Sequence, residues 1–301
     1  MISFNEYIKC CRQKLGLTQT RIVEELIKHN ASFTGLDITT YSRWERGVTT
    51  PKYQRKKSIL SYFFSRTLTF YPYIDFENNS NLHQSAQRLP LPNSLHNHLL
   101  VMNLPMCHFP DKQIESIPIQ ESNQSSLATS FNHLIIKALY DFNINTIRHK
   151  HLISNPGNFS MVCLFNDNYM GHLFCLKIKT SVYHKLIRFK MSVSELNTEH
   201  LADDSEDGGL LFFGLFSLSN EVLKNLWAQL YNWLAINQKK IQFIGAITSD
   251  KESFHTLLEL EIEHIGTTKR KTKIYHSLSS PLKKVMLSEP VINTMFYPVK
   301  N

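Results

Sequence analysis

Two short stretches near the N-terminus carry the side chains whose types and spacing best fit a chemical task. The first is Leu17-Thr18-Gln19, and the second is Ser42-Arg43-Trp44-Glu45-Arg46-Gly47. Hydroxyl and amide side chains at a helix start bind phosphate oxygens, and side chains on the first turns of a helix reach base edges in the major groove. These residues therefore indicate binding to duplex DNA.

Positive charge is concentrated around the same stretches. The chain has 301 residues and a net charge of +8. Residues 1–70 contain 12 lysines and arginines against 5 aspartates and glutamates, so nearly all of the excess lies in under a quarter of the chain. A local excess of this kind is the electrostatic footprint of a polyanionic partner.

Helical periodicity supplies the elements that would position these side chains. An apolar repeat from Phe4 to Cys11 predicts a first helix, which stops at Gly16. Thr18 is a good N-cap for a second helix. A third helix is expected to begin near Asp37 and end at Gly47, and a further segment follows Pro51.

In this order and spacing, residues 3–66 resemble the Cro/C1-type (XRE family) helix-turn-helix domain. The resemblance implies that Thr18 and Gln19 touch the DNA backbone, with Gln19 also within reach of a base. It implies base reading by Thr39, Thr40 and Arg43, a phosphate or base contact by Ser42, and phosphate contacts by Arg46 and Lys52. Arg12 and Glu45 match two family positions that form an ion pair between the first and third helices.

The two motif elements lie further apart here than in the family, because the chain has extra residues around 28–36. Either the second helix is longer or the turn is a true loop. The first domain is placed at residues 1–68. Residues 69–130 contain six of the 11 prolines and are predicted to be a linker with short local structure.

Residues 131–301 are predicted to form an α/β domain. Strand-like runs at 159–165 and 169–178 flank the turn residues Asn166-Asp167-Asn168. A buried strand at 210–218 precedes a helix at 220–237, a strand at 241–247, a helix at 251–263 and a strand at 273–278. This order resembles the GNAT acyltransferase fold, so the chain is expected to be multidomain, all-α and then α+β.

The GNAT resemblance implies a glycine-rich turn that holds the pyrophosphate of coenzyme A, and a tyrosine acid in the last helix. The turn here is Phe216-Ser217-Leu218-Ser219-Asn220-Glu221, without glycine or a basic residue, and Leu257 stands nearest the tyrosine position. We therefore expect no enzyme activity and no cofactor, and assign this domain to sensing or dimerisation.

Other polar and aromatic groups receive structural interpretations. His149 and His151 lack a third ligand at metal spacing. The acidic run 199–207 fits a solvated loop, and Lys269-Arg270-Lys271 with Lys273 fits a hairpin turn. The aromatic residues Trp227, Tyr231 and Trp233 fit a core.

Cysteine usage and hydropathy indicate the cellular compartment. The five cysteines have irregular spacing and no CxxC motif, which favours reduced thiols. No apolar run reaches membrane length and the N-terminus lacks an apolar leader region, so a cytoplasmic location is expected.

These observations predict a sequence-specific DNA-binding transcriptional regulator that works as a homodimer on double-stranded DNA and responds to a small-molecule or protein effector. The alternative is a GNAT-type acyltransferase that carries a DNA-binding domain. A pure interaction protein is a third class. A regulator with all-helical peptide-sensing repeats is disfavoured by the predicted strands.

Overall fold

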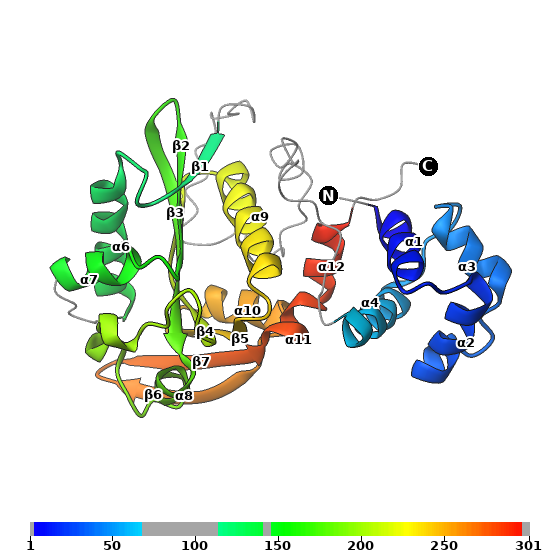
Figure 1. The fold of residues 1–301 in the computed structure, drawn as a ribbon. Coiled ribbons are helices and arrows are strands. Elements are labelled where there is room, and N and C mark those ends of the chain that lie inside the picture. The colour runs from blue at the N-terminus through cyan, green and yellow to red at the C-terminus, as the bar shows by residue number, and fades with distance from the viewer. Residues whose placement is uncertain (1–2, 68–113, 141–145, 297–301) are drawn as a thin grey trace. The chain divides into compact units, whose positions relative to one another are not determined.

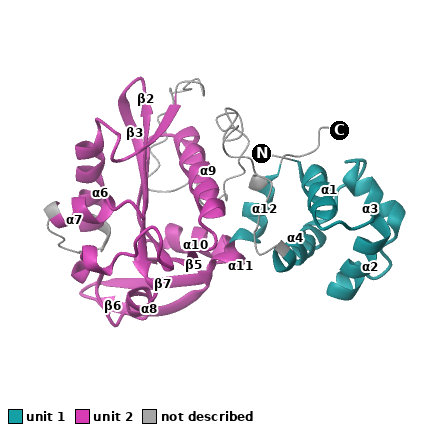
Figure 2. Ribbon diagram, in the orientation of Figure 1, with its two compact units in different colours: residues 1–81, 286–301 teal, residues 82–285 magenta. Residues whose placement is uncertain are grey.

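The computed structural model describes residues 3–67, 114–140 and 146–296. The chain divides into two compact units (Figure 2). One contains residues 1–81 and 286–301, and the other contains residues 82–285. None of the helices in the described ranges has both the length and the hydropathy needed to cross a bilayer.

The first unit is helical (Figure 1). Its elements are α1 (Phe4–Lys14), α2 (Gln19–His29), the 3₁₀ turn η1 (Ala31–Phe33), α3 (Ile38–Glu45), α4 (Tyr53–Thr67) and α12 (Glu289–Met295). Thr18 caps α2 by accepting a hydrogen bond from the Arg21 amide, and Asp37 caps α3 by accepting one from the Thr40 amide. The helix starts predicted from Thr18 and Asp37 are therefore confirmed.

The extra residues between the two motif elements form a loop, not a longer second helix. The α2 helix ends at His29, and η1 follows directly. Phe33 and Leu36 of this loop are buried. Gly35 has a φ of +77°, a left-handed conformation that glycine adopts without strain. The loop is therefore a packed part of the unit, and Arg55 of α4 donates a hydrogen bond to its Ser32 carbonyl at 3.1 Å.

The first unit also contains the C-terminal helix, which the sequence assigned to the second domain. Phe296 packs edge-on against Phe4, with ring centroids 5.1 Å apart, and lies 5.3 Å from Tyr7. The Tyr53 hydroxyl donates a hydrogen bond to the Leu287 carbonyl at 3.1 Å. The predicted boundary at residue 68 is thus incomplete, because aromatic side chains of α1 are covered by residues from the far end of the chain.

The second unit is built on one mixed sheet. Its strands are β1 (Ile114–Pro118), β2 (Phe159–Phe165), β3 (Asn168–Lys179), β4 (Gly208–Ser217), β5 (Ile241–Thr248), β6 (His264–Arg270) and β7 (Lys273–Pro281). Its helices are α6 (Ser125–Tyr140), α7 (Thr146–Ile153), α8 (Thr180–Ile187), α9 (Asn220–Ile236), α10 (Lys251–Glu259) and α11 (Leu282–Met286). The last residue of α11 belongs to the first unit by the division above.

The sheet order is β1-β2-β3-β4-β5-β7-β6, and only β4 and β5 pair in parallel. Asn166 and Asp167 make the turn between β2 and β3 with positive φ angles of 47° and 62°. Both angles are those of a tight hairpin turn, and asparagine and aspartate tolerate them. The predicted α/β class and this hairpin are confirmed.

Helices cover both faces of the sheet. Buried side chains of α6, α7 and α8 form one core with Leu176 and Leu211. Figure 1 shows α9 against the opposite face. Next to Tyr275, which belongs to the first core, His276 points the other way and contacts Phe254 of α10. Helices α9 and α10 therefore share the second face.

Most of the predicted linker at 69–130 lies outside the described residues. Its last part forms β1, paired with β2, and the beginning of α6. Pro118 ends β1 at a sheet edge, where a missing backbone donor is tolerated. Residues 114–130 are thus part of the second unit.

Candidate functional site

A buried ion pair connects α1 to α3 in the first unit. The Arg12 guanidinium donates through Nε to Glu45 Oε1 at 2.6 Å and through Nη2 to Oε2 at 3.1 Å. The Glu45 side chain is 3 % exposed and that of Arg12 is 14 % exposed. The hydrogen bonds to Glu45 raise the pKa of Arg12. Arg12 and Glu45 therefore form an ion pair that links α1 to α3.

The start of α2 joins the same network. Gln19 Nε2 donates to Glu45 Oε2 at 2.7 Å, and Arg12 Nη1 donates to the Leu17 carbonyl at 2.8 Å. Gln19 is half-buried, whereas its neighbour Thr18 is exposed. The network therefore fixes the N-terminus of α2 relative to α3, and it engages the amide that sequence reasoning assigned to DNA.

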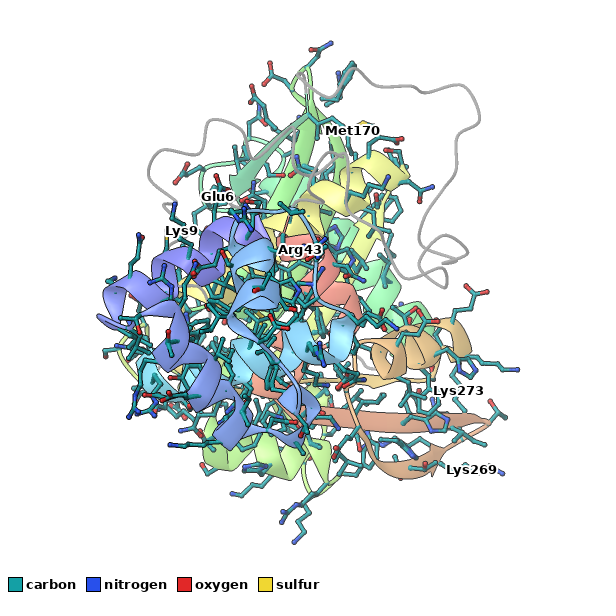
Figure 3. All side chains as sticks on the ribbon, turned by 90° about the vertical axis from the view of Figure 1, so that its right-hand side faces the viewer. Glu6, Lys9, Arg43, Met170, Lys269 and Lys273 are labelled. Atoms are coloured by element: carbon teal, nitrogen blue, oxygen red, sulfur yellow. The ribbon has the colours of Figure 1, made fainter. Side chains whose placement is uncertain are left out.

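The outer face of α3 carries the predicted base-reading residues. Thr39 and Arg43 are exposed and four residues apart, so they lie on one face of the helix. Thr40 is half-buried, and its hydroxyl donates to Asp37 Oδ2 at 3.2 Å. Ser42 is also half-buried. Thr39 and Arg43 are thus more accessible than Thr40 and Ser42. Arg43 is labelled in Figure 3.

The predicted phosphate-binding residues lie at and beyond the end of α3. Arg46 and Lys52 are both exposed, and Arg46 Nε donates to the Ser42 carbonyl at 3.3 Å. Trp44 is buried, and the Arg55 guanidinium lies 5.9 Å from the centre of its ring. Arg43, Arg46 and Lys52 fall within a span of ten residues in the sequence, on α3 and in the turn that follows it.

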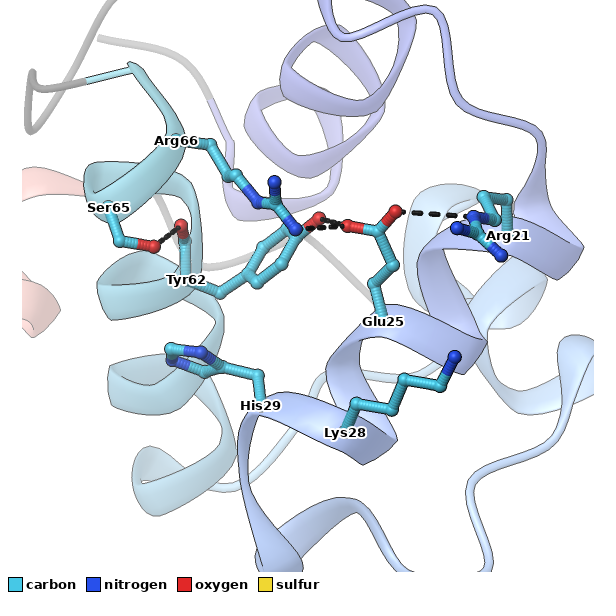
Figure 4. Close-up of a pocket in the computed structure, with 7 residues that line it drawn as sticks. All are labelled: Arg21, Glu25, Lys28, His29, Tyr62, Ser65 and Arg66. Carbon is cyan, nitrogen blue, oxygen red and sulfur yellow. Dashed lines mark hydrogen bonds and ion pairs between the residues drawn. The ribbon is translucent and has the colours of Figure 1, made fainter.

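A cleft of about 520 Å³ lies between α2 and α4 (Figure 4). Its lining includes Arg21, Lys28 and Arg66. Glu25 accepts hydrogen bonds from Tyr62 and from Arg66 Nη2, the latter at 2.8 Å, and Arg21 Nε lies 3.3 Å from its carboxylate. The Tyr62 hydrogen bond, followed by the charges of Arg66 and Arg21, lowers the pKa of Glu25.

The sequence did not single out this cleft. The spacing of Arg21 and Glu25 signals a helical ion pair, but Tyr62 and Arg66 come from a distant helix. The carboxylate occupies the centre and is already surrounded by donors. We therefore assign the cluster to holding α2 against α4.

In the second unit, β4 and β5 diverge. They pair over residues 208–211 of β4, and β4 then continues to Ser217. Between Phe212 and Gly214, β4 also has an extra residue relative to β3. The turn after β4 is as polar and glycine-free as its sequence indicates. Ser219 caps α9 through the Val222 amide, and Glu221 is in the first turn.

A chain of buried polar side chains lies beside this part of β4. The Tyr169 hydroxyl meets His172 Nδ1 at 2.5 Å, His172 Nε2 meets Asn132 Oδ1 at 3.3 Å, and Asn132 Nδ2 meets His149 Nε2 at 3.0 Å. The amide donates to His149, so His149 carries its proton on Nδ1. Burial lowers the pKa of His172 to about 3 and that of His149 to about 4.

His149 and His151 do not form a common site. They lie on helix α7, where residues two apart point in different directions, and His149 is buried while His151 is exposed. Sequence reasoning missed the helix because Arg148–His151 is a fully polar run. The burial of His149 depends on its hydrogen bond with Asn132, a contact that no local sequence pattern indicates.

The remaining sequence candidates have structural roles. The buried Lys177 donates to the carbonyls of Asp203 and Asp204, at 2.7 and 3.3 Å, and so orders the acidic loop. Lys269 and Lys273 flank the β6–β7 turn (Figure 3). Trp227 and Tyr231 are buried on α9, and Trp233 packs against Phe159. Leu257 is a buried residue of α10. Among the described residues, no group of three or more histidines, cysteines or acidic residues is arranged to hold a metal ion.

Comparisons with known proteins find similarity in structure only. No family model and no curated protein sequence matches the chain. An N-acetyltransferase from Staphylococcus aureus Mu50 is similar to 56 % of this chain over 97 % of its own length, with 12 % identity and a TM-score of 0.36. FeeM, an N-acyl amino acid synthase from uncultured soil microbes, is similar to 60 % of this chain over 97 % of its own, with 12 % identity and a TM-score of 0.39.

An aminoglycoside N(6')-acetyltransferase from Legionella pneumophila gives 11 % identity and a TM-score of 0.34, and covers 60 % of this chain and 97 % of its own.

Proposed function

We propose that the chain is a sequence-specific DNA-binding transcriptional regulator, and that α3 of the first unit reads the major groove. One observation carries the proposal. The exposed Thr39 and Arg43 stand on a helix whose orientation is fixed by the buried network of Arg12, Gln19 and Glu45. A reading helix must be held rigidly, because base contacts tolerate little misplacement.

Charge supports the same reading. The exposed Arg46 and Lys52 lie at the end of α3 and in the turn after it, and residues 1–70 contain nearly all of the net positive charge of the chain. Phosphate contacts of this kind position a protein on the duplex, and base contacts then specify the sequence. Arg43 is the side chain that would discriminate guanine, by about 1–3 kcal/mol per contact.

The test is a selection of bound sequences from random DNA, performed with the full chain. Arg43→Ala should relax the consensus at one position of each half-site. Lys9→Ala, which removes the same charge from the exposed face of α1, should leave the consensus unchanged. An Arg43→Ala consensus identical to that of the natural chain would refute base reading by α3.

The same selection tests the expected homodimer. One small domain reads too few bases for a unique genomic site, so we expect an inverted repeat with half-sites about one helical turn, ~10 base pairs, apart. A consensus without inverted symmetry would exclude a two-fold dimer on DNA.

A second candidate function is acyl transfer by the second unit. It is favoured by the divergence of β4 from β5, because β4 residues 212–217 extend beyond the last parallel pair. An unpaired strand edge can bind an extended chain that contains amides, such as the pantetheine arm of coenzyme A. Against it stand Glu221, which repels a phosphate at the start of α9, and Leu257, which cannot donate a proton.

Titration of the full chain with acetyl-coenzyme A by calorimetry decides between a binding and a non-binding second unit. Saturable heat that Glu221→Gln strengthens would support a coenzyme A site. No heat at millimolar ligand would remove this candidate.

A further inference from the structure

The β6–β7 hairpin contains a bulge that changes which side chains share a face. Thr267 pairs with His276, Gly266 with Ser277, and His264 with Leu278, so Ile265 is an extra residue in β6. In a regular strand, residues three apart point to opposite faces. The bulge turns His264 onto the face that carries Thr267 and His276, as bulges do when they re-aim a side chain.

Three donor atoms meet on this face. His264 Nε2 lies 3.4 Å from His276 Nδ1 and 3.1 Å from Thr267 Oγ1, and the Thr267 oxygen lies 3.4 Å from His276 Nδ1. His264 Nε2 also lies 2.9 Å from the Gly266 carbonyl oxygen, to which it donates its proton, so a metal ion would bind here by replacing that hydrogen bond. A tetrahedral zinc ion with bonds of ~2.05 Å to nitrogen separates its ligand atoms by ~3.3 Å. The triangle of donor atoms therefore has the dimensions of one face of such a tetrahedron.

A neighbouring helix holds both imidazole rings. The ring of Phe254, from α10, lies 5.4 Å from His264 and 4.6 Å from His276, measured between ring centroids. The two rings are thus held beside each other on this face, and neutral imidazole nitrogen is a common metal ligand.

We propose that His264 and His276 form a binding site for a divalent first-row transition-metal ion such as Zn²⁺, with the Thr267 hydroxyl beside it and water at the remaining positions. Imidazole nitrogen is a favoured ligand for zinc, copper and nickel, and a poor one for magnesium and calcium. With only two histidine ligands, the site would bind weakly and exchange its ion readily. Such a site suits a response to metal concentration more than permanent structural support.

The test is titration of the full chain with Zn²⁺ in chelator-free buffer, with the number of bound equivalents measured by calorimetry. Because the chain contains 14 histidines, the readout is the difference between matched variants. His264→Ala and His276→Ala should each lose one equivalent. His255→Ala, an exposed histidine on α10, should lose none.

His264 is exposed, so His264→Ala leaves the core intact and reports on the site even if His276→Ala unfolds. Co²⁺ provides a second readout, because tetrahedral coordination produces visible absorption that should disappear in His264→Ala. Equal zinc stoichiometry and equal affinity in His264→Ala and the natural chain would overturn the proposal. Loss of the same equivalent in His255→Ala would also overturn it, since the ion would then not be held by this pair.

Discussion

Gly214 of β4 leaves the space that Asn132 of α6 occupies. A Cβ atom at Gly214 would lie 1.7 Å from Oδ1 of Asn132, which no pair of unbonded atoms tolerates. The absent side chain thus allows the amide to sit between His172 and His149. One glycine on a strand thereby determines whether four polar side chains can be buried together.

Gly214→Ala should consequently destabilise the second unit by about 2–4 kcal/mol, because it overpacks the site and breaks buried hydrogen bonds. Asn132→Ala alone should also be costly, since it removes the amide that hydrogen-bonds to Nε2 of both His172 and His149. The double variant should lose less than the sum of the two, because the clash is gone. The measurement is thermal unfolding by calorimetry.

Gly266→Ala is the matched control for this comparison of the single and double variants. A Cβ at Gly266 would meet its nearest atom at 3.7 Å, an ordinary contact. Additive losses for Gly214→Ala and Asn132→Ala would show that the two residues do not share the space.

Arg12→Ala should markedly lower the melting temperature of the first unit. Removing one partner of a buried pair leaves an uncompensated charge and costs about 3–5 kcal/mol. Of the two side chains described above that donate to Glu45, only Gln19 would remain, and its amide is uncharged. Glu24→Ala tests the contrast, because Glu24 and its partner Arg21 are each at least half exposed and such pairs contribute about 0–1 kcal/mol. Similar losses in both variants would place the Arg12 pair among weak surface interactions.

DNA affinity should fall steeply with salt, since each phosphate contact releases counterions. Lys52→Ala should weaken binding to all sequences about equally and reduce the slope of log affinity against log salt by about 1. Equilibrium binding of the full chain to a selected site and to random duplex, at several salt concentrations, measures both effects. A change of sequence preference in Lys52→Ala would identify Lys52 as a base reader.

Acid should destabilise the second unit in the window between the pKa of an unfolded histidine, about 6.5, and the depressed folded values. His172 and His149, with folded values of about 3 and about 4, bind protons only in the unfolded chain across most of this range. Stability therefore falls as pH drops from about 6.5 towards 4.

His172→Gln removes one of these titrating groups and should flatten the dependence of the melting temperature on pH. The groups that surround His172 are Tyr169, Asn132 and, through Asn132, His149. An identical pH profile in the variant would exclude His172 as a source of acid lability.

Local patterns predicted the helices and strands whose signals are self-contained. Thr18, Asp37 and Ser219 each cap the helix that follows them, and the hairpin at Asn166-Asp167 has the expected turn. The predicted face of α3 required only its start at Asp37 and a period of 3.6 residues.

Non-local contacts account for what the sequence did not reveal. Helix α8 follows β3 without a break, and its Tyr183 fits against the strands because Gly209 and Gly245 leave room there. The strand β6 begins at His264, directly after the helix expected at 251–263, and its sequence has no alternation of apolar residues. The meeting of His264 with Thr267 and His276 depends on the bulge at Ile265. A strict period of two residues would place His264 and Thr267 on different faces of the strand.

The return of the chain to the first unit has a consequence for biosynthesis. Phe4 and Tyr7 are translated before any part of the second unit, and Phe296, which packs against both rings, is translated after all of it. During translation, this apolar surface of α1 stays uncovered until the entire mixed sheet has been made. The helical unit is thus complete only after Phe296 has been made, so a change at this residue would act on a helix that is translated before the whole second unit.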